Sequence, residues 1–324
     1  MIPANILGRV VHSSGVQDET LVRLDVLSVY LLERLNETGL LDHMCFKGGI
    51  SLRKVFARQP SRFSRDVDFV DSSYEQLTDT GLRVEDYYIK VLEGFDNQTV
   101  HDILWKVKNI DDESLHAPSL RIDVHFFIYD DRPDDHWERR TDNVLSIECS
   151  FRRPIYLKPQ LRQLRNESWF RQLEFEPSPV PVLQTEEAIA EKIRAAFQRS
   201  NPRDIFDLHQ YGQLTFREEL VRKLTVLKCW QDRGTYDGPS NFNADELLGK
   251  LRLENYPWER LRAQVSNHAW IEPGRLLDSL RNRYNFITDL GEQELVLCND
   301  RGQSQQPLHD NLWEECRNLH DERE

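Results

Sequence analysis

The sequence predicts an α/β (α+β) fold in which a short mixed sheet flanked by helices is followed by a mostly helical C-terminal half. Two observations predict the sheet. A strand is predicted at Asp66 and Asp68, after a glycine pair, Gly48 and Gly49, at which a helix is expected to begin. The segment 119–129 alternates polar and apolar side chains, as a strand with one buried face does. We therefore expect the N-terminal half to be built around strands near these positions.

Apolar residues at helical spacing predict helices on both sides of this region. A helix over 22–41 is expected to pack beside the sheet and to lead into the glycine pair. The proline-rich segment Pro177–Pro181 is interpreted as a linker. Beyond it, helices are predicted at 187–199, 202–211, 217–231, 244–252, 259–265 and 275–286, with an amphipathic one within 309–324. We predict one domain over 1–176 and a helical domain over 182–324, with the functional site in the cleft between them.

The glycine pair lies in the run from Phe46 to Arg53, which reads FKGGISLR. Glycines at the start of a helix leave backbone N–H groups accessible, and such groups can bind a phosphate. An ordinary turn is the alternative, because paired glycines also occur wherever a chain bends. The pair alone does not decide between these two interpretations.

Two aspartates, Asp66 and Asp68, follow in the run RFSRDVDF on a predicted strand. They are two residues apart, so their side chains project to the same face. Carboxylates that share a face repel, and they sit together at low cost only in water or around a cation. Such oxygen ligands suit Mg²⁺ that also holds substrate phosphates. A solvated sheet edge is the alternative for the aspartates alone, but together with the glycine pair they predict a metal–phosphate site.

A third carboxylate, Asp123, lies on the predicted strand 119–129. The face expected to be buried carries Ile122, Val124 and Phe126. Asp123 lies on the opposite face, from which it could approach Asp66 and Asp68. An ordinary polar strand face is the alternative.

Four segments of the chain resemble the AbiEii family of nucleotidyltransferase toxins, which belong to the DNA polymerase β superfamily. They are the Lys-Gly-Gly-x-Ser-Leu run, the Arg-Phe-Ser-x-Asp-x-Asp-Phe run, Glu191-Lys192 and the run RDIFDL from Arg203 to Leu208. They occur in the family's order over roughly residues 46–211. The resemblance implies a polymerase-β-like nucleotidyltransferase sheet. It also implies the toxin of a type IV-like toxin–antitoxin or abortive-infection system, whose cognate antitoxin is encoded nearby.

The resemblance assigns roles to individual residues. It implies a phosphate-side nucleotide site made by Lys47, Gly48, Gly49, Ser51 and Arg53. It implies that the metal, Mg²⁺ or Mn²⁺, is held by Asp66, Asp68 and Asp123, and that Asp123 alternatively accepts the proton of the attacking hydroxyl. Lys192 matches the family's motif lysine, and Asp204 and Asp207 match the acidic positions of its last motif. We expect Lys192 and Asp204 to contact the NTP, and the three metal-binding carboxylates, Lys192 and Asp207 to act in catalysis.

The local pattern leaves alternatives at these last positions. Lys192 falls at the edge of an apolar helical stripe, so its ammonium could reach a triphosphate or extend into solvent. Asp204 and Asp207 share one face of a predicted helix. A surface ion pair between Arg203 and Asp207 is one interpretation. A buried Asp207 that fixes Lys192 or an arginine is the one we prefer, and the sequence does not rank the two aspartates.

Composition indicates a soluble globular protein. The 324 residues are 39% hydrophobic and 30% charged. No apolar run approaches membrane-spanning length and the N-terminus lacks the pattern of a signal peptide, so we expect a cytoplasmic protein without a membrane partner. The five cysteines lack metal-ligand spacing and are expected to be reduced packing residues.

The formal net charge of −13 opposes non-specific binding to nucleic acid. One basic segment, 151–171, nevertheless combines arginines with aromatic residues. Arginines can bind RNA phosphates and aromatics can stack on unpaired bases. The RNA-contacting candidates are Arg152, Arg153, Arg162 and Arg165. A solvated connector is an equally open interpretation.

Together these features predict a metal-dependent transfer of a nucleotide from an NTP to an acceptor hydroxyl. The resemblance implies that the acceptor is an RNA, with the 3′ end of a tRNA as the leading candidate, and that the outcome is growth arrest. Two other functions fit the same residues: a non-catalytic NTP-binding interaction module and a metal-dependent nuclease. The glycine pair and the distant lysine favour transfer, because a nuclease does not need to hold a triphosphate.

Overall fold

The computed structural model describes residues 4–16, 18–57, 61–72, 84–100, 103–110, 119–128, 144–150, 155–232 and 241–322. The described strands form one mixed sheet in the order β3-β4-β5-β6-β2-β1-β8-β7. They are β1 Met44–Lys47, β2 Asp66–Asp71, β3 Gln98–Val100, β4 Ile103–Ile110, β5 Ser119–Ile128, β6 Val144–Ser150, β7 Gln160–Arg162 and β8 Val180–Val182. The predicted class, a mixed sheet flanked by helices, is confirmed.

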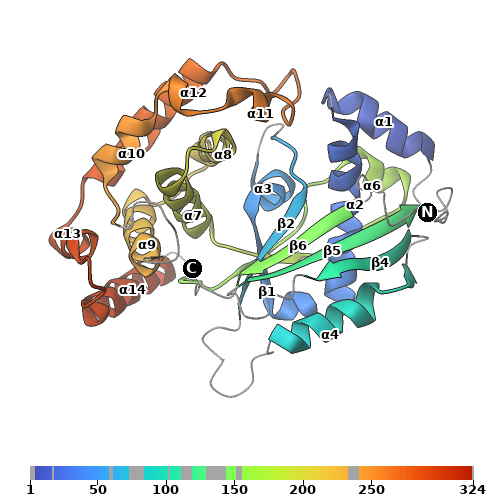
Figure 1. Cartoon of the computed structure of the whole chain (residues 1–324), viewed down its shortest axis with the longest axis horizontal. Coiled ribbons are helices and arrows are strands. Elements are labelled where there is room, and N and C mark those ends of the chain that lie inside the picture. The colour runs from blue at the N-terminus through green and yellow to red at the C-terminus, as the bar shows by residue number, and fades with distance from the viewer. Residues whose placement is uncertain are drawn as a thin grey trace.

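Helices flank the sheet on two sides (Figure 1). The N-terminal ones are α1 Ala4–Ser14, α2 Glu19–Glu37, α3 Gly48–Ser51 and α4 Val84–Phe95, and α6 Ser168–Gln172 lies near α1 and α2 in this view. The C-terminal ones are α7 Thr185–Gln198, α8 Pro202–Gly212, α9 Glu218–Gln231, α10 Ala244–Lys250, α11 Trp258–Arg262, α12 Pro273–Arg283, α13 Glu292–Asn299 and α14 Gln306–Asp321. Helices α7 and α8 lie nearest the strands, and the later helices form an arc outside them.

Helix α2 packs on the sheet through a continuous apolar cluster. Leu27 and Leu31 of α2 are fully buried, as are Phe46 of β1, Phe69 of β2 and Phe126 of β5. The apolar face predicted for residues 119–129 is therefore confirmed. Burial of one face leaves the other face of these central strands free to carry polar groups.

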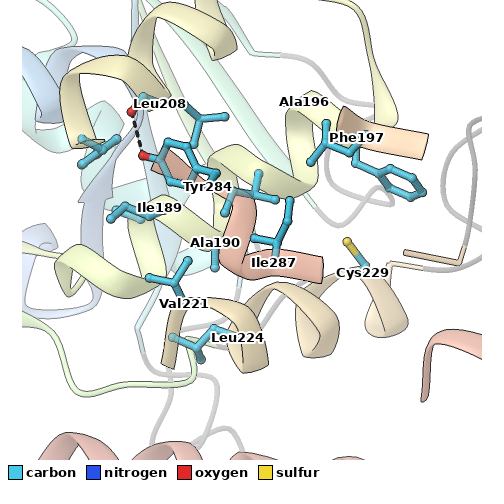
Figure 2. Packing of buried hydrophobic residues seen from close by; sticks show 14 of the residues in the cluster. Ile189, Ala190, Ala196, Phe197, Leu208, Val221, Leu224, Cys229, Tyr284 and Ile287 are labelled. Carbon is cyan, nitrogen blue, oxygen red and sulfur yellow. Dashed lines mark hydrogen bonds between the residues drawn. The ribbon is translucent and has the colours of Figure 1, made fainter. Parts of the chain in front are cut away.

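A second apolar cluster joins the C-terminal helices. Figure 2 shows Ile189 of α7 near Val221 and Leu224 of α9, with Tyr284 between neighbouring helices. The Tyr284 hydroxyl donates a hydrogen bond of 2.7 Å to the Leu208 carbonyl of α8. This packing fixes α7 and α8, the two helices that reach the site, against the outer helices.

The segment predicted to be a linker contributes a strand. Val182 of β8 pairs with Phe46 of β1 in parallel orientation, and both Val180 and Val182 are buried. The strand was not predicted because prolines are uncommon in strands and only two alternating valines, Val180 and Val182, form its apolar pattern. The division into domains at residues 176 and 182 stays a prediction.

Other local expectations can be compared with the described residues. Asn201 caps α8 and Pro202 follows it, as predicted. Helices α1, α4, α6 and α13 were not predicted. All five cysteines are buried, as expected for packing residues. None of the helices within the described ranges is long and apolar enough to cross a membrane.

Candidate active site

The register of four neighbouring strands brings polar side chains into two rows. In the first row Lys47 of β1 pairs with Asp68 of β2, and Asp68 pairs with Glu148 of β6. Asp66 begins the second row and pairs with Ser146 of β6, which in turn pairs with Asp123 of β5. Paired residues in neighbouring strands point to the same face. The three predicted carboxylates therefore share one face of the sheet, together with Glu148.

Asp66 and Asp68 are not directly paired with a cation in the part of the chain that the structure describes. Neither carboxylate makes an ion pair or hydrogen bond with another residue of the described ranges. Burial and the neighbouring Asp66 charge raise the pKa of Asp68 to about 6, although Lys47 acts in the opposite direction. A half-buried carboxylate pair without a counter-ion fits a hard divalent cation, which such oxygen donors hold together with substrate phosphates.

Asp123 lies farther from this pair than Glu148 does. Two strand spacings of about 4.8 Å separate Asp123 from Asp66, with Ser146 between them. The Ser146 hydroxyl donates a 2.5 Å hydrogen bond to Asp123, whereas Arg121 forms a 2.9 Å ion pair with Glu148. Within the part of the chain that the structure describes, no three His, Cys, Asp or Glu side chains are grouped so as to hold one metal ion.

Glycine is required at positions 48 and 49 because charged side chains lie directly against the backbone there. Gly48 has φ +80°, and a Cβ there would lie 2.0 Å from Asp68 Oδ2. A Cβ at Gly49 would lie 2.5 Å from a terminal nitrogen of Arg62. A side chain at either position would displace a charged group of the site. The glycines thus allow β1 and α3 to lie directly against the carboxylate of Asp68 and the guanidinium of Arg62.

Asp207 is a fully buried anion with two cationic partners. Arg62 donates to both of its oxygens at 2.7 and 2.8 Å, and Lys192 lies 2.7 Å from Asp207 Oδ2. Burial alone would raise the pKa of Asp207, but Arg62 and Lys192 outweigh it and hold that pKa below its usual value. The preferred interpretation, a buried Asp207 that fixes Lys192 and an arginine, is confirmed. The surface pair with Arg203 is not formed, because Asp207 has no exposed surface.

Asp204 is a second carboxylate partner of Lys192. Its carboxylate lies 3.2 Å from Lys192 Nζ and accepts two hydrogen bonds from Arg199, at 2.7 and 3.1 Å. Burial opposes ionisation, yet Lys192 and Arg199 lower the pKa of Asp204 to about 2. Burial likewise opposes the charge on Lys192, but Asp207 and Asp204 raise its pKa above the ordinary value. Lys192 is therefore a fixed ammonium ion rather than a mobile surface lysine.

A cavity of about 360 Å³ opens between the sheet and α7. Its charged lining consists of the cations Lys47, Lys192, Arg194 and Arg199 and the anions Asp68, Glu148 and Glu191. Gly48 lies beside Asp68 in this lining. Lys47, Gly48, Asp68 and Lys192, predicted from separate motifs, thus meet at one place.

Other predicted residues lie elsewhere. Ser51 is buried, and Arg53 donates to Asp25 at 2.8 Å while its guanidinium stacks on Phe63, so neither lines the cavity. Arg162 and Arg165 are exposed on β7 and the turn after it. Arg152 and Arg153 lie outside the described residues.

The expected base-stacking aromatics are not available in the described part of the basic segment. Tyr156, Trp169 and Phe170 are at most 5% exposed. They pack in the two apolar clusters, because each large ring contributes more to stability inside the core than on the surface. This part of the RNA-binding hypothesis is wrong, and the role of the segment's arginines stays a prediction.

Sequence reasoning missed Arg62 and Glu148. Arg62 stands at the start of the RFSRDVDF run, but nothing in its spacing indicated that it would bind an aspartate 145 positions later in the chain. Glu148 alternates with apolar neighbours on β6, and this pattern could have identified it. Burial and the negative charge of Asp66 raise the pKa of Glu148.

Comparison with known proteins identifies the family. The sequence model described as "Nucleotidyl transferase AbiEii toxin, Type IV TA system" matches residues 30–283. This chain belongs to the AbiEii family. It is thus a nucleotidyltransferase toxin of the type IV toxin–antitoxin class, which confirms the family expected from its motifs.

A solved structure has the same fold as this AbiEii protein. MenT4, a nucleotidyltransferase toxin from Mycobacterium tuberculosis H37Rv, aligns with a TM-score of 0.77 and 23% sequence identity. The alignment covers 98% of the AbiEii chain and 100% of the MenT4 chain. No significant match was found among curated protein sequences.

Replacing Gly48 with alanine is expected to lower the free energy of unfolding by roughly 2 kcal/mol or more, because the Cβ would be strained and would displace Asp68. Gly249→Ala is the matched control, since a Cβ there meets nothing within 4 Å. Urea unfolding of both variants measures the difference. A Gly48→Ala protein as stable as the control would contradict the close approach.

The raised pKa of Asp68, about 6 against 3.8 for a free side chain, predicts a pH-dependent penalty in the metal-free protein. A carboxyl whose pKa is raised by folding costs stability as pH rises from about 4 through about 6. At about pH 7.5, Asp68→Asn should therefore be more stable than the parent by about 1–3 kcal/mol, and near pH 4 the difference should vanish. Thermal unfolding of both proteins in the presence of a chelator, from about pH 4 to about pH 7.5, tests the sign of this stability difference. A variant that is less stable at every pH would show that Asp68 is not under this strain.

Proposed function

We propose that this AbiEii protein transfers a nucleotide from an NTP to the hydroxyl of an RNA acceptor in a reaction that requires Mg²⁺ or Mn²⁺. The supporting observation is the unneutralised pair Asp66 and Asp68 beside a cavity lined by four cationic side chains. Phosphoryl transfer is accelerated mainly by positioning and by charge stabilisation. The site combines carboxylates that could hold a metal ion with lysines that could bind phosphates.

Asp66 and Asp68 are the residues that would hold the metal ion. When bound, the ion would neutralise charge on the triphosphate during transfer. Lys192 would bind the phosphates, because Asp204 and Asp207 hold its ammonium in place at the cavity wall. Lys47 and the backbone at Gly48 would contact the phosphates from the opposite wall.

The proton of the attacking hydroxyl needs an acceptor. Asp123 is assigned this role, or that of a third metal ligand, by the family resemblance. Glu148 is a second candidate, because its strand lies directly beside β2 and its pKa is raised toward neutrality. Substitution of each residue in turn would distinguish the two.

The family supports two partners, the NTP and a cognate antitoxin. An RNA acceptor, with the tRNA 3′ end as the leading candidate, and growth arrest extend this proposal. The two alternatives give different products. A nuclease would cleave the RNA without consuming NTP, and a non-catalytic module would bind NTP without releasing pyrophosphate. Incubation with each labelled NTP and total RNA separates all three.

Asp66→Asn and Asp68→Asn should each lower nucleotide transfer by at least a hundredfold, because each removes one of the charges that hold the metal. Ser64→Ala is a control on the same segment that leaves both carboxylates in place. Transfer is measured as label incorporated into RNA at several Mg²⁺ concentrations. Normal activity in both aspartate variants would remove the metal assignment.

Lys192→Ala should weaken NTP binding or turnover at least tenfold, since the phosphates lose their fixed ammonium. Lys192→Arg should restore only part of the loss, because a planar guanidinium does not replace a compact charge between Asp204 and Asp207. Lys223→Ala removes an equally buried, ion-paired lysine that does not line this cavity, and it serves as the control. NTP titration of the three variants decides, and unchanged binding in Lys192→Ala would assign Lys192 a structural role only.

A further inference from the structure

A second cavity, of about 540 Å³, lies beside the first and is strongly basic. We call it the arginine cavity. Its lining includes Arg65, Arg199, Arg203 and Arg260, against the single carboxylate of Asp18. The arginines come from three separate parts of the chain: Arg65 directly before β2, Arg199 and Arg203 from the α7–α8 connection and the first turn of α8, and Arg260 from α11. A protein of net charge −13 thus gathers positive charge at this place.

The charges of the arginine cavity are only partly neutralised. Arg65 forms a 3.1 Å ion pair with Asp18, and Arg199 binds Asp204. No carboxylate in the described part of the chain pairs with Arg203 or Arg260. Burial and the nearby charge of Arg62 lower the pKa of Arg203, and Arg199 acts in the same direction. Like charges held together in this way are typical of a surface that binds a polyanion.

The arginine cavity adjoins the first cavity, and Arg65 in its lining directly precedes Asp66 in the chain. Arg199 lines both cavities, which makes them neighbours. Asp68 lines the first cavity, whereas Asp66 interacts electrostatically with Arg203 of the second. In phosphoryl transfer the attacking and leaving oxygens lie roughly in line on opposite sides of the phosphorus. A triphosphate in the first cavity would leave the neighbouring arginine cavity to the attacking acceptor.

We propose that the arginine cavity binds the phosphate backbone of the RNA acceptor next to its 3′ end, so that the terminal hydroxyl reaches the site past Asp66. This inference rests on the proposed function, which it deepens by placing the acceptor. It moves the acceptor away from the predicted segment 151–171, whose described aromatics are buried. RNA is favoured over a second nucleotide, because arginines from three chain segments match successive phosphates better than one compact triphosphate.

The test is the affinity for a 5′-fluorescein RNA hairpin with a short unpaired 3′ strand, measured by anisotropy without NTP. The double variant Arg65→Gln with Arg260→Gln removes two exposed charges and spares Arg203, which is half-buried beside Asp66. Arg275→Gln with Arg301→Gln makes the same charge change at exposed positions outside both cavities. A third variant, Arg162→Gln with Arg165→Gln, tests the basic segment.

The first variant should bind the hairpin roughly tenfold or more weakly near 0.1 M salt, and the slope of log affinity against log salt should become shallower by about 1–2. The affinity of the control variant, Arg275→Gln with Arg301→Gln, should stay within about twofold of that of the parent protein, because these arginines do not contact the RNA. Binding of labelled NTP with Mg²⁺ should be unchanged in both. Equal RNA binding in the first variant and the control, or a loss confined to the third variant, would overturn the inference. A loss of NTP binding in the first variant would also overturn it, by assigning the cavity to the nucleotide.

The two proposals fail separately. Hairpin binding does not require turnover, so an RNA that binds through these arginines but is never modified would refute the proposed transfer and leave the inference standing. If the first variant transferred nucleotides to RNA with wild-type efficiency and salt dependence, the inference about the arginine cavity would be refuted and the proposed transfer would stand.

Discussion

The buried carboxylate of Asp207 is the interaction on which the geometry of the site depends. It joins Arg62, which precedes β2, to Lys192 of α7, and it is itself carried by α8. Removing one partner of such a buried group leaves an uncompensated charge, at a cost of about 3–5 kcal/mol. The helices therefore hold a fixed position relative to the strand that carries Asp66 and Asp68. The spacing between lysine and carboxylates is set by charge as well as by apolar packing.

The aspartates of the site fall into two groups according to the direction of their pKa shifts. Burial raises the pKa of Asp68, whereas cationic partners lower those of Asp204 and Asp207 despite burial. Environments that drive the pKa values of neighbouring acids apart indicate different roles. Asp204 and Asp207 are permanent anions, and each is buried and holds two protein cations. Asp66 and Asp68 remain available to a cation that the protein itself does not supply.

Local features of this site could be read from the sequence because they depend on spacing alone. The shared face of Asp66 and Asp68, the buried face of β5 and the Asn201 cap follow from residues that are close together in the chain. The contact of Arg62 with Asp207 could not be predicted, since no local pattern encodes a pairing across 145 positions. The prediction that aromatic residues of the basic segment 151–171 stack on RNA bases was wrong for a related reason. Trp169 and Phe170 face the core, and that depends on how α6 packs rather than on the composition of the segment.

The charges of the first cavity explain why the metal and the nucleotide should depend on each other. Lys192 is bound by two carboxylates, Lys47 lies 3.6 Å from Glu191, and Arg199 is bound to Asp204. These cations are largely neutralised before a ligand arrives, so their attraction for a free triphosphate is reduced. The sheet wall of this cavity presents Asp68 and Glu148, which repel a triphosphate. A divalent cation at Asp66 and Asp68 would reverse the sign of that wall, because ion and carboxylates then act together. The protein's own cations would therefore orient a triphosphate, whereas its binding would depend mainly on the ion that the aspartate pair holds.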